Sequence, residues 1–203
     1  MNLFFHFSVD GFSNTYLLGP DAGGDAILID PGTMNVALLN LIESNGYYIR
    51  NVLVTHGHES HVAGLKTLRK IYDFDIYAEA DTVLDFSCIR IGGGQTLKLG
   101  EFTIKVYALH GHSSDSLAFV VESCLFTGDV MNAGALGSTP NGYARELLIG
   151  EITSKLLRGS ENYYVFPGHG APSTLEAERL INPAFAGSRK SVSSPSSDQG
   201  AEP

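Results

Sequence analysis

The sequence is poor in cysteine and in positive charge. Its two cysteines, Cys88 and Cys124, are too few for a disulfide framework and do not form a CxxC metal site. We expect both to be small buried apolar residues, which suits a reducing compartment. The 13 lysines and arginines stand against 22 aspartates and glutamates, which gives a net charge of −9. This balance argues against a nucleic-acid or anionic-membrane partner, because both are bound through basic patches.

Long apolar runs are also missing. No stretch is long enough to cross a bilayer, and the first residues lack the basic segment with which a signal peptide begins. We therefore expect a cytoplasmic protein that acts on a small-molecule substrate and has no membrane partner. The sequence carries no signature of an oligomeric state.

The length and composition predict one folded domain. A hydrophobic fraction of 43% is ordinary for a globular core, and 203 residues suit a single domain. We place this domain at residues 1–185. Residues 186–203 are rich in serine, proline and glycine and cannot bury enough apolar surface to fold, so they are predicted to form a disordered tail.

Short apolar runs separated by turn residues predict an α/β chain. An N-terminal antiparallel meander is expected, followed by a helix that ends at Asn45-Gly46. The predicted strands are 3–8, 15–18, 26–30, 52–55, 76–78, 96–99, 102–109, 117–121, 125–127 and 163–166. The predicted helices are 36–42, a helix from His61 with Ser60 as its N-cap, 145–158 and 173–180. Gly64 inside the second helix indicates a close approach to a neighbouring loop.

Three histidines follow the strand 52–55 within six residues, in the loop position where open α/β sheets place their ligands. Neutral imidazole is the commonest metal donor in proteins. His56 and His58, two apart in an extended loop, can converge on one ion, and His61 can face a second. The alternative is a polar loop that is rich in histidine by chance.

Later strand ends carry residues of the same kind. The ligand-type residues after the strands 102–109, 125–127 and 163–166 are His110, His112, Asp129 and His169. Histidine confined to loops after apolar strands indicates a metal centre, because core packing would not produce that distribution. One carboxylate among several imidazoles favours zinc, iron or manganese over calcium or magnesium, which prefer oxygen ligands.

These motifs resemble those of the metallo-β-lactamase superfamily, and most closely its small glyoxalase II-like hydrolases. The resemblance runs from about Asn14 to Pro183. The motifs that carry it are His-x-His-x-Ser-His at 56–61, Gly111-His112, Gly128-Asp129 and Pro167-Gly168-His169-Gly170. The resemblance implies a four-layer αββα sandwich with metal ions at one edge of the paired sheets.

The resemblance also implies a role for each ligand. The implied ligands are His56, His58 and His112 for a first metal ion, His61 and His169 for a second, and Asp129 as a bridge between both. Zinc is expected, with iron or manganese as alternatives. A hydroxide held by the metal would attack the carbonyl of a thioester, an ester or a lactone.

The chain departs from the family pattern at Ser60. The family motif is His-x-His-x-Asp-His, and its aspartate binds the second metal ion and orients the attacking hydroxide. Serine has no charge and a shorter reach, and Glu59 cannot stand in because adjacent side chains point in different directions. We therefore expect one or two bound ions, with the second site weakened.

Three further residues are candidates for the site. His110 is predicted either as an acid or base beside the catalytic Asp129 or as a solvated loop histidine. Tyr143 could bind a substrate oxyanion from a lid, or simply pack. Asp30 could hold loop backbone near the metal ions, or be a plain turn residue.

Two other functions fit the same residues. His56, His112 and Asp129 alone form the two-histidine, one-carboxylate set of non-haem iron oxygenases. An iron enzyme similar to the persulfide dioxygenases of the superfamily is therefore the first alternative. A metal-binding protein that has lost catalysis is the second, and Ser60 is its only support.

Overall fold

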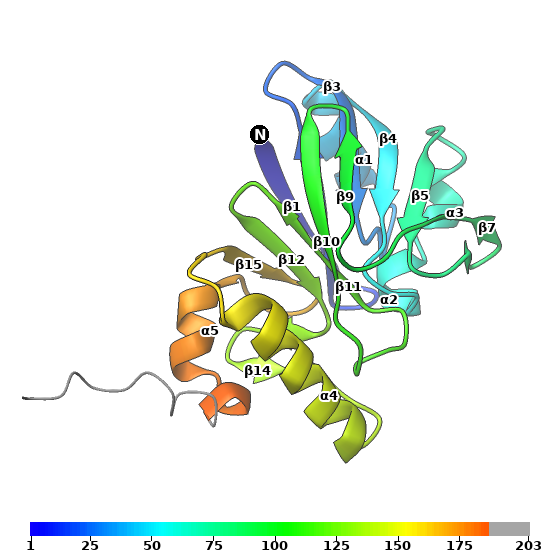
Figure 1. Ribbon diagram of the computed structural model, residues 1–203. Coiled ribbons are helices and arrows are strands. Elements are labelled where there is room, and N and C mark those ends of the chain that lie inside the picture. The colour runs from blue at the N-terminus through cyan, green and yellow to red at the C-terminus, as the bar shows by residue number, and fades with distance from the viewer. Residues whose placement is uncertain (187–203) are drawn as a thin grey trace, which may run out of the picture.

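Two six-stranded sheets pack face to face, and helices cover the outer face of each (Figure 1). The structure, a computed structural model, describes residues 1–186. The chain forms the four-layer αββα sandwich of the α/β class that the resemblance implies. The predicted disordered tail lies outside the described residues from residue 187 onward, and Ala186 ends a short 3-10 turn.

The first sheet contains most strands of the N-terminal half. Its first three strands form the predicted antiparallel meander, and from β3 onward neighbouring strands are parallel. In spatial order the strands are β1 (Asn2–Ser8), β2 (Ser13–Gly19), β3 (Gly24–Ile29), β4 (Tyr47–Leu53), β5 (Asp75–Ala78) and β8 (Ile89–Arg90). The helices on its outer face are α1 (Val36–Ser44), α2 (Glu59–Val62) and α3 (Leu65–Leu68).

The second sheet is antiparallel except where β12 pairs with β15. In spatial order its strands are β16 (Ser173–Thr174), β15 (Tyr164–Pro167), β12 (Cys124–Gly128), β11 (Leu117–Val121), β10 (Phe102–Ala108) and β9 (Thr96–Leu99). Its helices are α4 (Gly142–Ile152), extended by a π-helical turn (Thr153–Leu157), and α5 (Leu175–Ile181). Two ribbons complete the described chain: β6 (Thr82–Val83) with β7 (Phe86–Ser87), and β13 (Met131–Asn132) with β14 (Ala135–Leu136).

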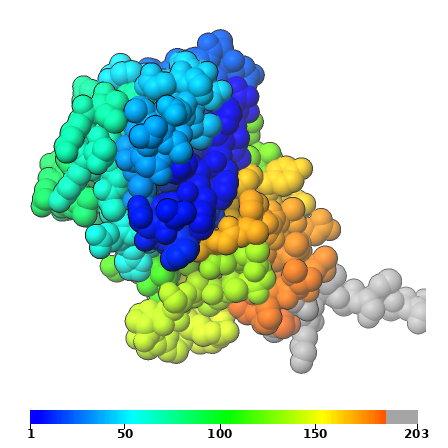
Figure 2. Space-filling model, turned by 180° about the vertical axis from the view of Figure 1, so that it is seen from behind, coloured from blue at the N-terminus to red at the C-terminus, as the bar shows by residue number. Residues whose placement is uncertain are grey.

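Three apolar cores hold the four layers together. The central core lies between the sheets and contains fully buried rings such as Phe119 and Phe126. Each outer core joins one sheet to its helices, and the predicted stripe of Leu148, Ile152 and Leu156 lies in one of them. Seen from behind, the two halves of the chain form adjoining blocks, with the N-terminal strand against C-terminal segments (Figure 2). No helix among residues 1–186 combines the length and the apolar character needed to cross a membrane.

The helix after the histidine motif differs from the prediction. It begins at Glu59, with His58 at the N-cap position, so Ser60 lies inside the helix and does not cap it. The helix is then interrupted at Gly64 before α3 begins. The close approach expected at Gly64 is confirmed, because its N–H donates to Pro31 O at 2.9 Å.

Element boundaries near the site also differ. The strand predicted at 52–55 begins earlier, at Tyr47, and ends at Leu53. Past the strand end the Val54 N–H still donates to Tyr77 O of β5, and the Thr55 N–H then donates to the Asp30 carboxylate at 2.8 Å instead. The two-residue strands β6, β7, β8, β13, β14 and β16 have no counterpart in the prediction, since two residues are too short to show a period.

Gly64 and Gly150 allow a matched test of this packing. An added Cβ at Gly64 would lie 2.5 Å from Pro31 O, whereas one at Gly150 in α4 would meet nothing within 4 Å. We expect Gly64→Ala to lower the free energy of unfolding by about 1–3 kcal/mol, because overpacking outweighs the gain in helix propensity. Gly150→Ala should raise it by about 0.5–1 kcal/mol. Urea unfolding measures both, and a stabilising Gly64→Ala would contradict the packing.

Candidate metal centre

Four loops bring the predicted ligands together at one edge of the sandwich. Each loop begins where β4, β10, β12 or β15 ends, so both sheets contribute. Backbone hydrogen bonds join the sheets here, since Leu117 N–H donates to Thr55 O. The side chains that come together are His56, His58, His61, His112, Asp129 and His169.

The first group contains three imidazoles and one carboxylate, from His56, His58, His112 and Asp129. The nitrogens that face one another are His56 Nε2, His58 Nδ1 and His112 Nε2, at separations of 3.0, 3.1 and 3.3 Å. The three rings stand at 78° to 87° to one another. Asp129 Oδ2 lies 3.8 Å from His56 Nε2 and 3.7 Å from His112 Nε2. Their lone pairs can therefore be directed at one common point.

The second group contains His61, His169 and the same carboxylate. Asp129 Oδ1 lies 2.7 Å from His169 Nδ1 and 3.3 Å from His61 Nε2. The two oxygens of Asp129 thus face different groups, Oδ2 the first and Oδ1 the second. This arrangement allows one carboxylate to bridge two ions. His61 is fully buried, whereas His169 is partly exposed.

Contacts on the far side of the rings determine how four of the five imidazoles point. A ring that donates one N–H outward keeps the lone pair of its other nitrogen for the inside, which is the usual arrangement of ligating histidines. The outward pairs are His61 Nδ1 with Asp30 Oδ2 at 3.1 Å, His112 Nδ1 with Ser138 O at 2.7 Å, His169 Nε2 with Gly11 O at 3.2 Å and His56 Nδ1 with Thr55 Oγ1 at 3.1 Å. In each of these rings the nitrogen left over is the one that faces a ligand group.

These residues fit a transition-metal ion. With Zn–N bonds of about 2.0–2.1 Å, nitrogens at tetrahedral positions lie about 3.3 Å apart, close to the spacing in the first group. Within the described part of the chain, the buried His61 Nε2 makes no hydrogen bond, although Asp129 Oδ1 is 3.3 Å away. A buried polar atom without a partner is costly, and an ion would satisfy this one. The nitrogen-rich donor set suits zinc, iron or manganese.

Glycines allow the backbone to approach the bridging carboxylate. A Cβ at Gly168 would overlap Asp129 Oδ1 and lie 2.6 Å from His61 Cε1. Gly128 has φ +50°, and a Cβ there would overlap the Thr55 side chain. The Gly-Asp and Gly-His pairs of the sequence motifs therefore have a steric reason.

For several of the ligand residues, burial and neighbouring charges shift the pKa in opposite directions. Burial would raise the pKa of Asp129, but contacts with His169 and His61 hold this pKa far below its usual value. Burial would lower the pKa of His61, but the carboxylates of Asp129 and Asp30 raise it to about 10. The pKa of His56 falls to about 4, mainly because of burial and then because of the nearby His61 charge. Without an ion, His61 is therefore protonated on both nitrogens and positively charged at neutral pH. His56 is neutral at that pH and has the lone pair that metal binding requires.

His110 and Tyr143 join neither ligand group. His110 Nε2 lies 3.2 Å from Glu79 Oε2, and the His110 backbone N–H donates to Glu151 Oε2 at 2.9 Å. The residue thus connects the segment after β5 to α4. Tyr143 is 80% exposed in the first turn of α4. The catalytic roles suggested for these two residues stay predictions.

Two acidic residues support the site from outside the ligand groups. Asp30 accepts the Thr55 N–H, in agreement with the interpretation that it holds loop backbone, and it also lies against His61. Asp115 accepts the Gly57 N–H at 2.9 Å and so fixes the histidine loop. No sequence motif marks Asp115, because its partner lies 58 positions away in the chain.

Comparison with known proteins gives a match over most of the chain. The family model described as the metallo-beta-lactamase superfamily matches residues 9–169. Among curated relatives, the hydroxyacylglutathione hydrolase GloC of Haemophilus influenzae is 30% identical over 200 residues, covering 86% of this chain and 94% of the relative.

Solved structures share the fold. The BLEG-1 B3 metallo-beta-lactamase superposes with a TM-score of 0.81 at 24% identity, covering 91% of this chain and 100% of the other. TTHA1623, solved in a di-iron-bound form, superposes with a TM-score of 0.74 at 26% identity, covering 89% of this chain and 98% of the other. The fold that carries the ligand groups therefore recurs in solved proteins.

The pKa shifts predict that the stability of the metal-free protein peaks near pH 6.5. His56 has a folded pKa of about 4, below its usual 6.5, so stability falls as the pH drops from 6.5 towards 4. His61 has a folded pKa of about 10, so its stabilising effect is complete below pH 6.5 and is lost as the pH rises through 10. Urea midpoints measured across this range with a chelator present test the expected maximum.

Excess zinc provides the control for this measurement. A bound ion replaces the proton on His61, so the decline on the alkaline side should disappear. A chelated protein whose urea midpoint stays flat from pH 6.5 to pH 10 would contradict the charge assigned to His61.

Proposed function

The chain belongs to the metallo-β-lactamase superfamily, and we propose that it is a metal-dependent hydrolase of an acyl substrate. The reacting group would be a thioester, an ester or a lactone carbonyl. The observation that carries this proposal is the first ligand group, whose three imidazole nitrogens face one point at the edge of the sandwich. His58 of this group is exposed, so a small substrate has access to that point.

Zinc is the ion we propose, with iron or manganese as alternatives. The first ion would be held by His56, His58 and His112, with Asp129 shared between the first and the second ion. A bound divalent ion supplies the Lewis acidity that lets water attack a carbonyl near neutral pH. The name of the Haemophilus influenzae relative, hydroxyacylglutathione hydrolase, supports testing thioesters first.

The protein's own groups keep the centre in the state that ligation needs. Asp129 stays ionised at neutral pH because its pKa is low, so both of its oxygens can accept. His56 stays neutral because its pKa is also low. The outward contact of His112 with Ser138 O holds its ring in place. Ligands that are oriented in advance need little rearrangement when the ion and the substrate bind.

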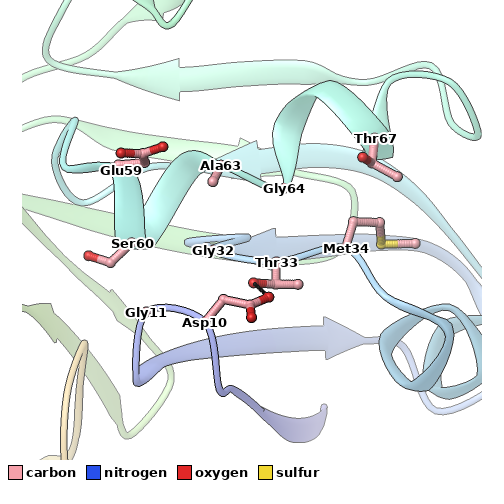
Figure 3. A pocket seen from close by; sticks show the side chains of 10 residues that line it. All are labelled: Asp10, Gly11, Gly32, Thr33, Met34, Glu59, Ser60, Ala63, Gly64 and Thr67. Carbon is pink, nitrogen blue, oxygen red and sulfur yellow. Dashed lines mark hydrogen bonds between the residues drawn. The ribbon is translucent and has the colours of Figure 1, made fainter.

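We propose that the second group binds its ion more weakly than the first. Ser60 stands where the family has an aspartate, so among residues 1–186 Asp129 is the one carboxylate in the second group. Ser60 instead lines a cavity of about 400 Å³, together with Asp10, Gly11 and Glu59 (Figure 3). Asp10 and Glu59 are exposed and belong to neither ligand group, so they do not replace the missing aspartate.

A panel of acyl thioesters, esters and lactones, assayed with zinc-loaded protein, tests the proposed reaction. We expect His58→Ala to lower kcat/KM by about 100-fold or more, because Lewis-acid stabilisation contributes several kcal/mol. Glu59→Gln, at the exposed neighbouring position, is the matched control and should leave kcat/KM unchanged. A fully metal-loaded protein that hydrolyses no member of the panel would refute the proposal.

Metal analysis after dialysis tests the weaker second site. We expect about one tightly held ion per chain in the wild type, since one group offers three imidazoles and the other only two. Ser60→Asp should raise the content towards two ions, because the new carboxylate adds both a ligand and a negative charge. Two tightly held ions in the wild type would show that the serine does not weaken the site.

An iron-dependent oxygenase is the second candidate function. His56, His112 and Asp129 face one another within the first group, as the two-histidine, one-carboxylate set of such enzymes requires. The di-iron form of TTHA1623 supports iron as an alternative ion. His58, which this set does not need, faces the same point at 3.0 Å from His56, so we place hydrolysis first. Oxygen consumption with a thiol persulfide by iron-loaded protein, without acyl hydrolysis, would reverse that order.

A further inference from the structure

Asp30 is a buried carboxylate that the proposed reaction does not use. It directly follows β3 and is only 2% exposed. Its backbone lies in the left-handed region, at φ +51°, where a residue other than glycine is strained. A charged and strained residue stays in such a place only if its contacts outweigh both costs.

The side chain of Asp30 contacts Thr55 and His61, and through them it is connected to the ligand groups. Its Oδ1 accepts the Thr55 backbone N–H at 2.8 Å, and its Oδ2 accepts the Thr55 hydroxyl at 2.6 Å. The same Oδ2 lies 3.1 Å from His61 Nδ1. Because the Thr55 hydroxyl donates its proton to Asp30, it can accept one from His56 Nδ1, 3.1 Å away. Asp30 therefore orients one histidine of each ligand group, His61 directly and His56 through Thr55.

The contact with Asp30 determines which nitrogen of the His61 ring is available to an ion. A carboxylate can only accept, so His61 must carry a proton on Nδ1 when it bonds to Asp30. Its Nε2, which faces Asp129, is then free for ligation. An imidazole that donates to a carboxylate is also a more basic ligand, so part of the charge of Asp30 reaches the second site.

We propose that Asp30 is a positioning residue that supplies, through His61, the negative charge that the second site lacks at Ser60. Among the described residues, Asp129 is the carboxylate of the second group, and Asp30 stands one hydrogen bond further out. The inference rests on the proposed function only in requiring that the centre binds metal ions. It follows that affinity for the second ion depends on Asp30 most strongly while position 60 is a serine.

Zinc titrations of four proteins test this dependence: the wild type, Asp30→Asn, Ser60→Asp and the double variant. In Asp30→Asn the amide oxygen can still accept the Thr55 N–H, but the amide nitrogen cannot accept from His61 and favours the wrong tautomer. We expect affinity for the second ion to fall by about 10–100-fold when position 60 is serine. The fall should be smaller in the Ser60→Asp background, where a carboxylate reaches the ion directly.

Asp115→Asn is the matched control. Asp115 also accepts a backbone N–H of the histidine loop, from Gly57, so it bonds to backbone there and not to a ring nitrogen. Because Asp115 fixes the histidine loop but contacts no ring of the second group, any change in affinity for the second ion in this variant should be the same with serine or aspartate at position 60. The proposal is overturned if folded Asp30→Asn retains wild-type affinity, or if the loss is equally large in the Ser60→Asp background.

A measurement on the wild type keeps the proposal testable even if Asp30→Asn does not fold. In zinc-loaded protein, long-range proton–nitrogen NMR should show His61 protonated on Nδ1 and ligated through Nε2. Ligation through Nδ1, or an Nδ1 without a proton, would overturn the role of Asp30. If the substrate panel fails while these binding results hold, only the proposed reaction is lost.

Discussion

The face-to-face packing of the two sheets is the constraint on which the centre depends. Each candidate ligand follows a strand end, and strands from both sheets end at the same edge. Bringing several polar side chains together at this edge costs desolvation, and the three apolar cores provide the opposing free energy. The hydrogen bond from Leu117 N–H to Thr55 O then fixes one sheet's loops against the other's. The nitrogens of the first group accordingly lie 3.0–3.3 Å apart on the framework that the cores support.

Two carboxylates organise this edge from different distances. Asp129 lies between the ligand groups and turns one oxygen towards each. Asp30 lies behind the rings and fixes the direction of His61 and, through Thr55, of His56. Asp30 is buried and the Asp129 side chain is 13% exposed, so salt screens their fields less than those of surface carboxylates. Asp129 thus acts as a member of both ligand groups, whereas Asp30 acts on them through the rings that it orients.

The sequence was most informative where apolar runs are long and end in ligand-type residues. The strand ends before His112, Asp129 and His169 could be predicted because periodicity and residue type agree there. The resemblance implies the division of the ligands into two groups, because their spacing in the sequence does not show which loops lie together in the fold. Capping preference is local and predicts Ser60 as an N-cap, whereas in the structure His58 holds that position and Gly64 packs against the loop at Pro31. The contact of Asp115 with the histidine loop depends on tertiary packing, which no local pattern carries.

The balance of charge is the physical basis of the role that we propose for position 60. Two divalent ions bound side by side would repel each other, and among the described residues Asp129 is the carboxylate that both ligand groups could use to offset this repulsion. Coulomb energy falls with distance, so a carboxylate one hydrogen bond behind His61 compensates less than one bound to the ion. The net charge of −9 creates a negative electrostatic potential that attracts cations, but this potential does not favour one of the two sites over the other. With Ser60 in place, we therefore propose that the second site depends on Asp30 for charge that an aspartate at position 60 would supply directly.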